Sequence, residues 1–131
     1  MILVILSLAT LILLFDNPPP SLQAADEITS SVRHVVDGDS LYLENYEPQI
    51  RLWGVDAPER DEPGYDRAKN YLRQLALSQT VDCEIVDTDK YKRSVARCYL
   101  SNGDEINRMM IESGAAKEYF RFTKGYYSSP R

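Results

Sequence analysis

The sequence predicts a mainly β domain of the α+β class, in which a small β barrel carries two packed helices. Three observations lead to this class. Short runs of alternating apolar and polar residues outnumber helical stretches, and turn residues separate them at hairpin spacing. Only two segments have apolar residues at helical spacing. At 131 residues, the chain has room for one domain with one modest core.

The composition limits the classes of function. A hydrophobic content of 44% with 27% charged residues is ordinary for a globular protein and argues against wholesale disorder. The formal net charge is −5, which argues against a broad basic surface. If the partner is a polyanion, we therefore expect a local binding site built around a metal ion.

The first 25 residues differ in character from the rest. Residues 1–15 are almost wholly apolar, and Asp16-Asn-Pro-Pro-Pro then ends any helix. The run is shorter than the roughly 20 residues that span a bilayer. Three interpretations stay open: an export signal cut after Ala24 or Ala25, an uncleaved anchor, or part of the fold. We expect residues 1–25 to be a signal peptide or N-terminal anchor, so that the protein is exported (periplasmic or secreted) or membrane-anchored through residues 1–15.

The next segments are predicted as a first hairpin. Residues 26–31 are polar and expected to form a flexible lead-in, and residues 32–43 form a strand bent at Gly38. A proline-containing link over residues 45–49 leads into a second strand, residues 50–55.

Two helices are predicted. The first covers residues 66–78 and the second covers residues 106–113, with Gly114 as its C-terminal stop. Their apolar faces carry Ala68, Tyr71, Leu72 and Leu75 in the first helix and Ile106, Met109 and Met110 in the second.

A second hairpin is predicted from residues 81–86 and 94–100, which both alternate. An antiparallel register would place Cys83 opposite Cys98, with both side chains pointing inward. In an exported chain the pair favours a disulfide; otherwise both are small core residues.

The residues that carry chemistry gather around the first hairpin. Asp37 and Asp39 are two residues apart, so they point the same way in an extended chain. Arg51 lies in the second strand, Asp56 directly follows that strand, and the turn at Pro58 brings Glu59 back towards Arg51. Hard oxygen ligands beside a guanidinium suit a divalent cation and a phosphate held together.

Three blocks of sequence resemble the thermonuclease (staphylococcal-nuclease-like) family over roughly residues 32–122. They are Asp37-Gly-Asp-Ser, Arg51-Leu-x-x-Val-Asp56-Ala-Pro-Glu59 and Asp89-Lys-Tyr-Lys-Arg93. The resemblance implies a five-stranded OB-fold barrel over residues 32–124 with a tail at 125–131. The third C-terminal helix of longer family members is expected to be absent.

The resemblance also implies roles for single residues. Asp39 and Asp56 match calcium-ligating carboxylates, Ala57 matches a ligand through its backbone carbonyl, and Asp37 matches a second carboxylate that orients this set. The implied catalytic residues are Glu59 as general base and Arg51 and Arg93 as phosphate ligands. The implied substrate-binding residues are Lys90, Tyr91, Phe120 and Phe122.

These roles describe a calcium-dependent phosphodiesterase, a nuclease that cuts DNA and RNA and leaves 3′-phosphates, working as a monomer without a stable protein partner. Two alternatives remain open. One is a non-catalytic OB-fold module that binds single-stranded nucleic acid. The other is a calcium-stabilised interaction domain, which leaves Arg51 and Arg93 unexplained.

One position departs from the family pattern. Lys92 stands where the family usually has glycine, and a glycine in a turn often marks a backbone with positive φ. Either Lys92 adopts that strained conformation, or the turn is rebuilt and Arg93 is aimed differently. The unchanged spacing from Asp89 to Arg93 favours the compact, strained turn.

Overall fold

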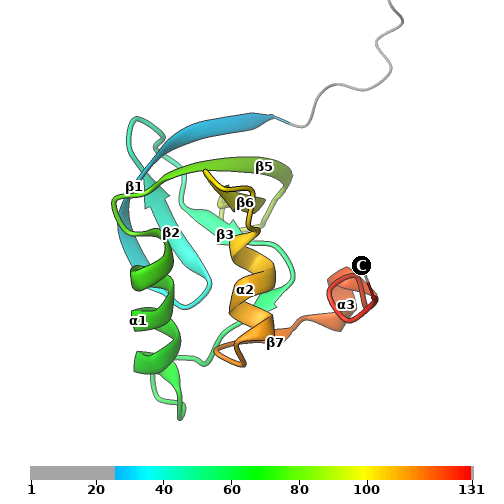
Figure 1. The fold of residues 1–131 in the computed structure, drawn as a ribbon. Coiled ribbons are helices and arrows are strands. Elements are labelled where there is room, and N and C mark those ends of the chain that lie inside the picture. Colours follow the sequence, from blue (N-terminus) through cyan, green and yellow to red (C-terminus); the bar gives the residue numbers. More distant parts are fainter. Residues whose placement is uncertain (1–25, 131) are drawn as a thin grey trace, which may run out of the picture.

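The computed structural model describes residues 26–130, with a closed five-stranded β barrel at its centre (Figure 1). The strands neighbour one another in the order β1-β2-β3-β6-β5, and each pair is antiparallel except the parallel pair β3–β6. Their bounds are β1 Glu27–Asp37, β2 Ser40–Leu43, β3 Ile50–Leu52, β5 Thr80–Thr88 and β6 Ser94–Leu100. The prediction of a five-stranded OB-like barrel is confirmed.

The N-terminal strand is longer than the sequence predicts. Residues 27–31 pair with β5, from Glu27 opposite Glu84 to Ser31 opposite Thr80. The expected flexible lead-in at 26–31 is therefore wrong for these residues, and the barrel begins at Glu27. The ladder uses backbone groups, so a strand with polar side chains pairs as well as an apolar one. The predicted signal peptide or anchor lies outside the described residues, and none of the helices within 26–130 is long and apolar enough to cross a membrane.

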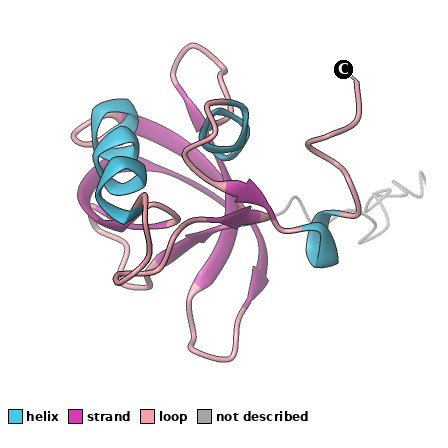
Figure 2. Cartoon of the chain, turned by 90° about the horizontal axis from the view of Figure 1, so that it is seen from below, coloured by secondary structure: helices cyan, strands magenta, loops and turns pink. Residues whose placement is uncertain are grey.

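Both predicted helices are present and lie against the same side of the barrel (Figure 2). Helix α1 runs over Tyr65–Ala76 and α2 over Ile106–Glu112. The buried apolar side chains of the two helices are Ala68, Leu72, Ala76, Ile106 and Met110. These side chains close one side of the barrel core, which the inward-facing residues of the strands fill from within.

Asn107 is a fully buried polar residue on the inner face of α2. Its Oδ1 accepts a hydrogen bond from the Cys98 backbone N–H at 3.0 Å. Its Nδ2 donates to the carbonyls of Trp53 at 2.9 Å and Ala96 at 3.0 Å. The Ala96 carbonyl also accepts the Trp53 backbone N–H at 2.8 Å, so the amide adds to the contacts between β6 and the turn after β3 and joins α2 to both.

The second hairpin has the predicted register, with Cys83 opposite Cys98. The two sulfurs are joined in a disulfide across the β5–β6 pair, and both side chains are fully buried.

The chain after α2 folds back along the barrel. Strand β7 (Lys117–Glu118) pairs with the short strand β4 (Val55–Asp56), and a single helical turn, α3 (Phe120–Thr123), follows. In both views α3 lies on the opposite side of the molecule from α1 (Figures 1 and 2). Within the described residues, α3 is the only helix after α2, so no long third helix is present there.

The segment predicted as a tail packs on the barrel. Tyr127 is only 5% exposed, and its ring lies 5.7 Å from that of Trp53. A Cβ on Gly54 would lie 2.3 Å from Thr123 Cγ2, and Gly54 has φ +73°. Only glycine therefore permits both the turn and the close approach of the C-terminal segment.

Candidate active site

The loop Asp37-Gly38-Asp39 joins β1 to β2 and lies beneath α1. A Cβ on Gly38 would approach the Cβ atoms of Ala68 to 2.7 Å and Ala57 to 2.8 Å. The sequence assigns Gly38 to a bend, and a register shift between Val35 and Asp37 is present. The close contacts give a further reason for glycine. A side chain at Gly38 would push both Ala68 of α1 and Ala57 away from the β1–β2 loop.

Asp39 is the buried carboxylate at the centre of the site, only 8% exposed. Its Oδ2 lies 3.2 Å from Arg51 Nη2 and accepts a hydrogen bond from the Ala57 N–H at 3.2 Å. Its Oδ1 accepts a hydrogen bond from Ser40 Oγ at 3.1 Å. Burial raises the pKa of Asp39 to about 7, against the opposing effect of Arg51.

The guanidinium of Arg51 is fixed by further contacts. Nη1 donates to the carbonyls of Leu52 at 2.9 Å and Val55 at 2.8 Å. Nη1 thus donates to two carbonyls, and Nη2 forms the ion pair with Asp39. Among the described residues Nε makes no hydrogen bond, so its N–H is open to a ligand such as a phosphate oxygen.

The predicted metal ligands lie on two adjacent loops. Asp37 Oδ1 accepts the Asp39 N–H at 3.1 Å, so Asp37 orients the loop that carries Asp39. Asp56 is exposed in β4, and Ala57 follows it directly, in contact with Asp39. Across residues 26–130 no three His, Cys, Asp or Glu side chains form a metal cluster. The carboxylates of Asp39 and Asp56 and the carbonyl of Ala57 are oxygen donors, the chemical type that calcium takes in proteins.

Arg93 is held by a separate turn. Asp89 Oδ2 lies 2.7 Å from Arg93 Nε, and Asp89 Oδ1 accepts the N–H groups of Tyr91 and Arg93, both at 2.9 Å. Burial alone would raise the pKa of Asp89, but the hydrogen bonds from Arg93 and Tyr91 outweigh it and lower that pKa. Lys92 has φ +63°, so it adopts the strained conformation that the sequence favours.

The barrel brings the two arginine-bearing segments together. Arg51 lies opposite Val95 in the parallel pair β3–β6. Arg93 lies two residues before Val95, and side chains alternate along a strand. The segment that carries Arg93 therefore lies beside the strand that carries Arg51.

Glu59 is exposed in the loop between β4 and α1. Its backbone N–H donates to Glu62 Oε1 at 2.9 Å. Among the described residues its carboxylate makes no hydrogen bond or ion pair with Asp39 or Arg51, so the structure does not join the predicted general base to the Asp39–Arg51 pair.

The predicted substrate-binding residues lie on two surfaces. Lys90 and Tyr91 are exposed in the Arg93 turn, where Lys90 Nζ and the Arg93 guanidinium lie 5.1 and 5.3 Å from the Tyr91 ring centre. Phe120 and Phe122 are 59% and 60% exposed in α3.

Tyr119 extends the aromatic surface of α3. Its ring lies 4.8 Å from that of Phe122. The sequence does not single out Tyr119, although the run Tyr119-Phe-Arg-Phe could have indicated it.

Comparison with known proteins gives a family match over more than half of the chain. The family described as staphylococcal nuclease homologue matches residues 49–129. This range contains Arg51, Asp56, Glu59 and Arg93 and begins after the Asp37–Asp39 loop.

Curated relatives share most of this chain. A succinoglycan biosynthesis protein, ExoI, from Rhizobium meliloti (strain 1021) is 34% identical over 106 residues, 72% of this chain and 54% of that protein. An uncharacterised endonuclease from Escherichia coli O157:H7 is 28% identical over 98 residues, 73% of this chain and 64% of that protein. A "Probable endonuclease LCL3" from Komagataella phaffii is 34% identical over 86 residues, 59% of this chain and 38% of that protein.

The chain thus spans between 38% and 64% of the length of these three relatives. The family match covers well over half of the chain, and it includes both arginines and the acidic loop between β4 and α1. The chain belongs to the staphylococcal nuclease family.

Proposed function

We propose that this protein is a calcium-dependent nuclease that hydrolyses phosphodiester bonds of DNA and RNA. The observation that carries the proposal is the contact between Arg51 and the buried Asp39, because it places a phosphate-binding group beside an oxygen ligand for a cation. The family membership and the endonuclease names among the relatives support the same reaction.

The metal ligands in this proposal are the carboxylates of Asp39 and Asp56 and the backbone carbonyl of Ala57. Bound calcium would offset negative charge on the scissile phosphate. Asp37 holds the Asp39 loop through the Asp39 N–H, and the Arg51–Asp39 contact keeps the guanidinium next to this set. Because Ala57 contributes only backbone atoms, its small side chain costs the site no ligand.

The side chains divide the hydrolysis between them. Glu59 takes a proton from the attacking water, whose oxygen forms a bond to phosphorus. Arg51 and Arg93 bind the non-bridging oxygens, on which charge develops in the transition state. The P–O5′ bond breaks, the 5′-oxygen takes a proton from solvent, and the products are a 3′-phosphate and a 5′-hydroxyl. Glu59 is exposed, so its carboxylate is accessible to the attacking water.

We also propose that the protein acts outside the reducing cytosol, as a monomer. The Cys83–Cys98 disulfide and the apolar residues 1–15 support export, because disulfides persist in oxidising compartments.

The decisive experiment incubates the purified full chain with single-stranded DNA or RNA in calcium, in magnesium, or in excess chelator. We expect cleavage in calcium alone, products with 3′-phosphate ends, and loss of cleavage in Arg51→Ala. Full activity in excess chelator would contradict calcium dependence. Tight binding without cleavage under all three conditions would instead identify a non-catalytic OB-fold module.

A further inference from the structure

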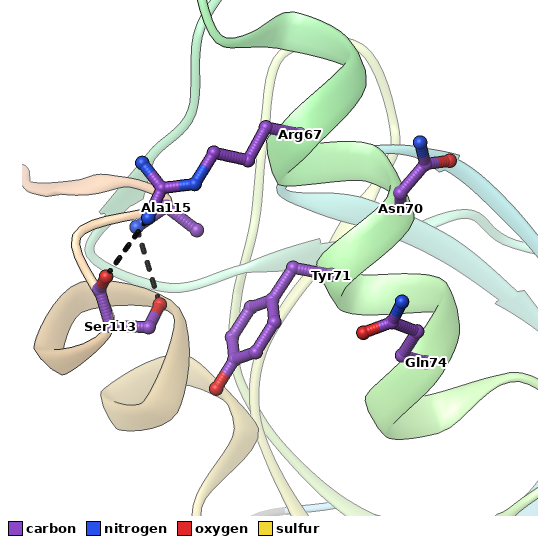
Figure 3. Close-up of a pocket in the computed structure, with 6 residues that line it drawn as sticks. All are labelled: Arg67, Asn70, Tyr71, Gln74, Ser113 and Ala115. Atoms are coloured by element: carbon purple, nitrogen blue, oxygen red, sulfur yellow. Dashed lines mark hydrogen bonds between the residues drawn. The ribbon is translucent and has the colours of Figure 1, made fainter.

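A groove lies between α1 and the end of α2, outside the three motif blocks (Figure 3). It has a volume of about 340 Å³. We call it the α1–α2 groove, and its lining residues are Arg67, Asn70, Tyr71, Gln74, Ser113 and Ala115. The first four lie at positions i, i+3, i+4 and i+7 along α1, so they form one face of that helix.

The side chains of the α1–α2 groove have unused hydrogen-bonding capacity. Arg67 Nη2 donates to the Ser113 carbonyl at a long 3.4 Å (Figure 3), and Arg67 forms no ion pair within residues 26–130. Asn70 and Gln74 contribute amide groups, and the Tyr71 ring lies between the two helices (Figure 3). None of the six lining residues carries a carboxylate, although the protein as a whole is acidic.

The α1–α2 groove adjoins a second hollow that reaches two of the predicted metal ligands, Asp56 and Ala57. A second hollow of about 300 Å³ is lined by Asp56 and Ala57 and also by Arg67 and Ala115, which the two hollows share. Lys117, the β7 residue opposite Asp56, lines the same hollow. We call Asp56 and Ala57 the metal loop. Arg67 therefore lies where a molecule bound at the metal loop would enter the groove.

The groove and the exposed aromatic residues flank the metal loop. On one side, the chain continues from Ala57 into α1. On the other side, β4 pairs with β7, and the chain continues from β7 into α3. Helices α1 and α3 lie on opposite sides of the molecule (Figure 1). An extended strand that crosses the metal loop could therefore contact Phe120 and Phe122 on one side and Arg67 on the other.

We propose that the α1–α2 groove is a second binding site for a single-stranded nucleic acid. Arg67 binds a backbone phosphate beyond the scissile one, and Tyr71 with the Asn70 and Gln74 amides contacts the adjoining nucleoside. A guanidinium beside an aromatic ring and amides provides charge, a stacking surface and hydrogen bonds to base edges. This inference rests on the proposed nuclease function, and it adds a contact that lengthens the recognised strand.

The test compares Arg67→Gln with Arg73→Gln. Arg73 lies on α1, is exposed and does not line the groove, so its replacement removes the same charge from the same helix. On a 20-nucleotide DNA strand in calcium, Arg67→Gln should raise KM by about three- to tenfold with little change in kcat. It should also reduce the slope of log KM against log salt by about 0.7, the value of one lost phosphate contact. Arg73→Gln should change neither quantity.

Substrate length and binding provide the remaining controls. On a dinucleotide, which cannot reach from the metal loop into the groove, the two variants should have the same KM. Arg67→Lys should keep most of the salt slope, whereas a purely structural role would lower the melting temperature without altering that slope. Fluorescence anisotropy of the 20-nucleotide strand, in calcium and on a Glu59→Gln background, should show the same difference in Kd.

Failure of the groove proposal is distinct from failure of the nuclease proposal. If the wild-type protein cleaves DNA but the two variants share KM and salt slope on the long strand, the groove is not a nucleic-acid site. If the wild-type protein cleaves neither substrate, the nuclease proposal fails. In that case equal anisotropy Kd values for both variants would overturn the groove proposal as well, and weaker binding by Arg67→Gln alone would sustain it.

Discussion

Arg51 Nη2 lies 3.2 Å from Asp39 Oδ2, while Arg51 Nη1 donates to the carbonyls of Leu52 and Val55. The phosphate-binding arginine and the buried metal-binding carboxylate of the proposed site therefore form one contact. Replacing Arg51 leaves the buried Asp39 carboxylate without its charged partner, which costs about 1–3 kcal/mol or more. The planar shape of the guanidinium allows Arg51 to contact Asp39 and both carbonyls at once.

The first prediction concerns Arg51→Lys. A lysine cannot contact Asp39, two carbonyls and a phosphate at once, because it lacks the planar fork. We expect kcat/KM for this variant to fall almost as far as for Arg51→Ala. Arg97→Lys is the matched control, since Arg97 pairs with Glu84 and not with a residue of the proposed site, and its kcat/KM should change less than about threefold. Recovery of most activity by Arg51→Lys would show that positive charge alone suffices.

The second prediction concerns Glu59→Gln. If Glu59 is the general base, this variant should lower kcat by about 10² or more and leave substrate affinity nearly intact. Glu62→Gln is a close control, because it lies in the same loop and its amide oxygen can still accept the Glu59 N–H. Single-turnover rates and anisotropy on the same oligonucleotide separate chemistry from binding. A near-wild-type rate for Glu59→Gln would assign the base to another residue.

The third prediction follows from the lowered pKa of Asp89. A carboxyl with a folded-state pKa below its unfolded value of about 3.9 stabilises the fold at higher pH and loses this contribution as pH falls through the folded pKa. Asp89→Asn should therefore be less stable than the wild type at pH 7, and the difference should shrink towards pH 2.5. Urea denaturation at both pH values measures it. A difference that is independent of pH would show that shape, and not charge, matters at this position.

The fourth prediction concerns Lys92, whose φ of +63° is costly for a residue with a Cβ. Lys92→Gly should raise the free energy of unfolding by about 1 kcal/mol and change activity by less than about tenfold. Lys90→Gly makes the same replacement in the same turn at a position without positive φ, and we expect it to lower stability. A lower melting temperature for Lys92→Gly would show that Lys92 makes a stabilising contact that outweighs the strain.

Features that depend on local pattern could be predicted from the sequence. The alternation in residues 81–86 and 94–100 indicated a hairpin, and its register put Cys83 opposite Cys98, as the structure shows. The strand at 27–31 could not be predicted in this way, because its side chains are mostly polar and its partner β5 lies some fifty residues away. Asn107 was missed for a similar reason. A polar residue on an apolar helix face shows its role only when the three backbone groups that it binds are in place.

The candidate site was predictable as a set of residues but not as a set of contacts. The motif blocks and the family resemblance single out Arg51 and Asp39, yet their contact depends on the register that places Ser40 opposite Arg51. The strained turn at Lys92 followed from one departure from a family pattern. Arg67 carries no motif, and only the packing of α1 beside α2 puts it next to the metal loop.

The parallel pairing of β3 with β6 has a consequence for how activity appears during folding. The segments that carry Arg51 and Arg93 are distant in sequence, and they become neighbours only when β3 pairs with β6. Pairings between distant segments form slowly, because the intervening chain must lose entropy before they are stabilised. An intermediate that holds the β5–β6 hairpin and both helices would still lack a phosphate-binding site. Recovery of catalysis after denaturation therefore reports barrel closure itself, and should lag behind the return of helical circular dichroism.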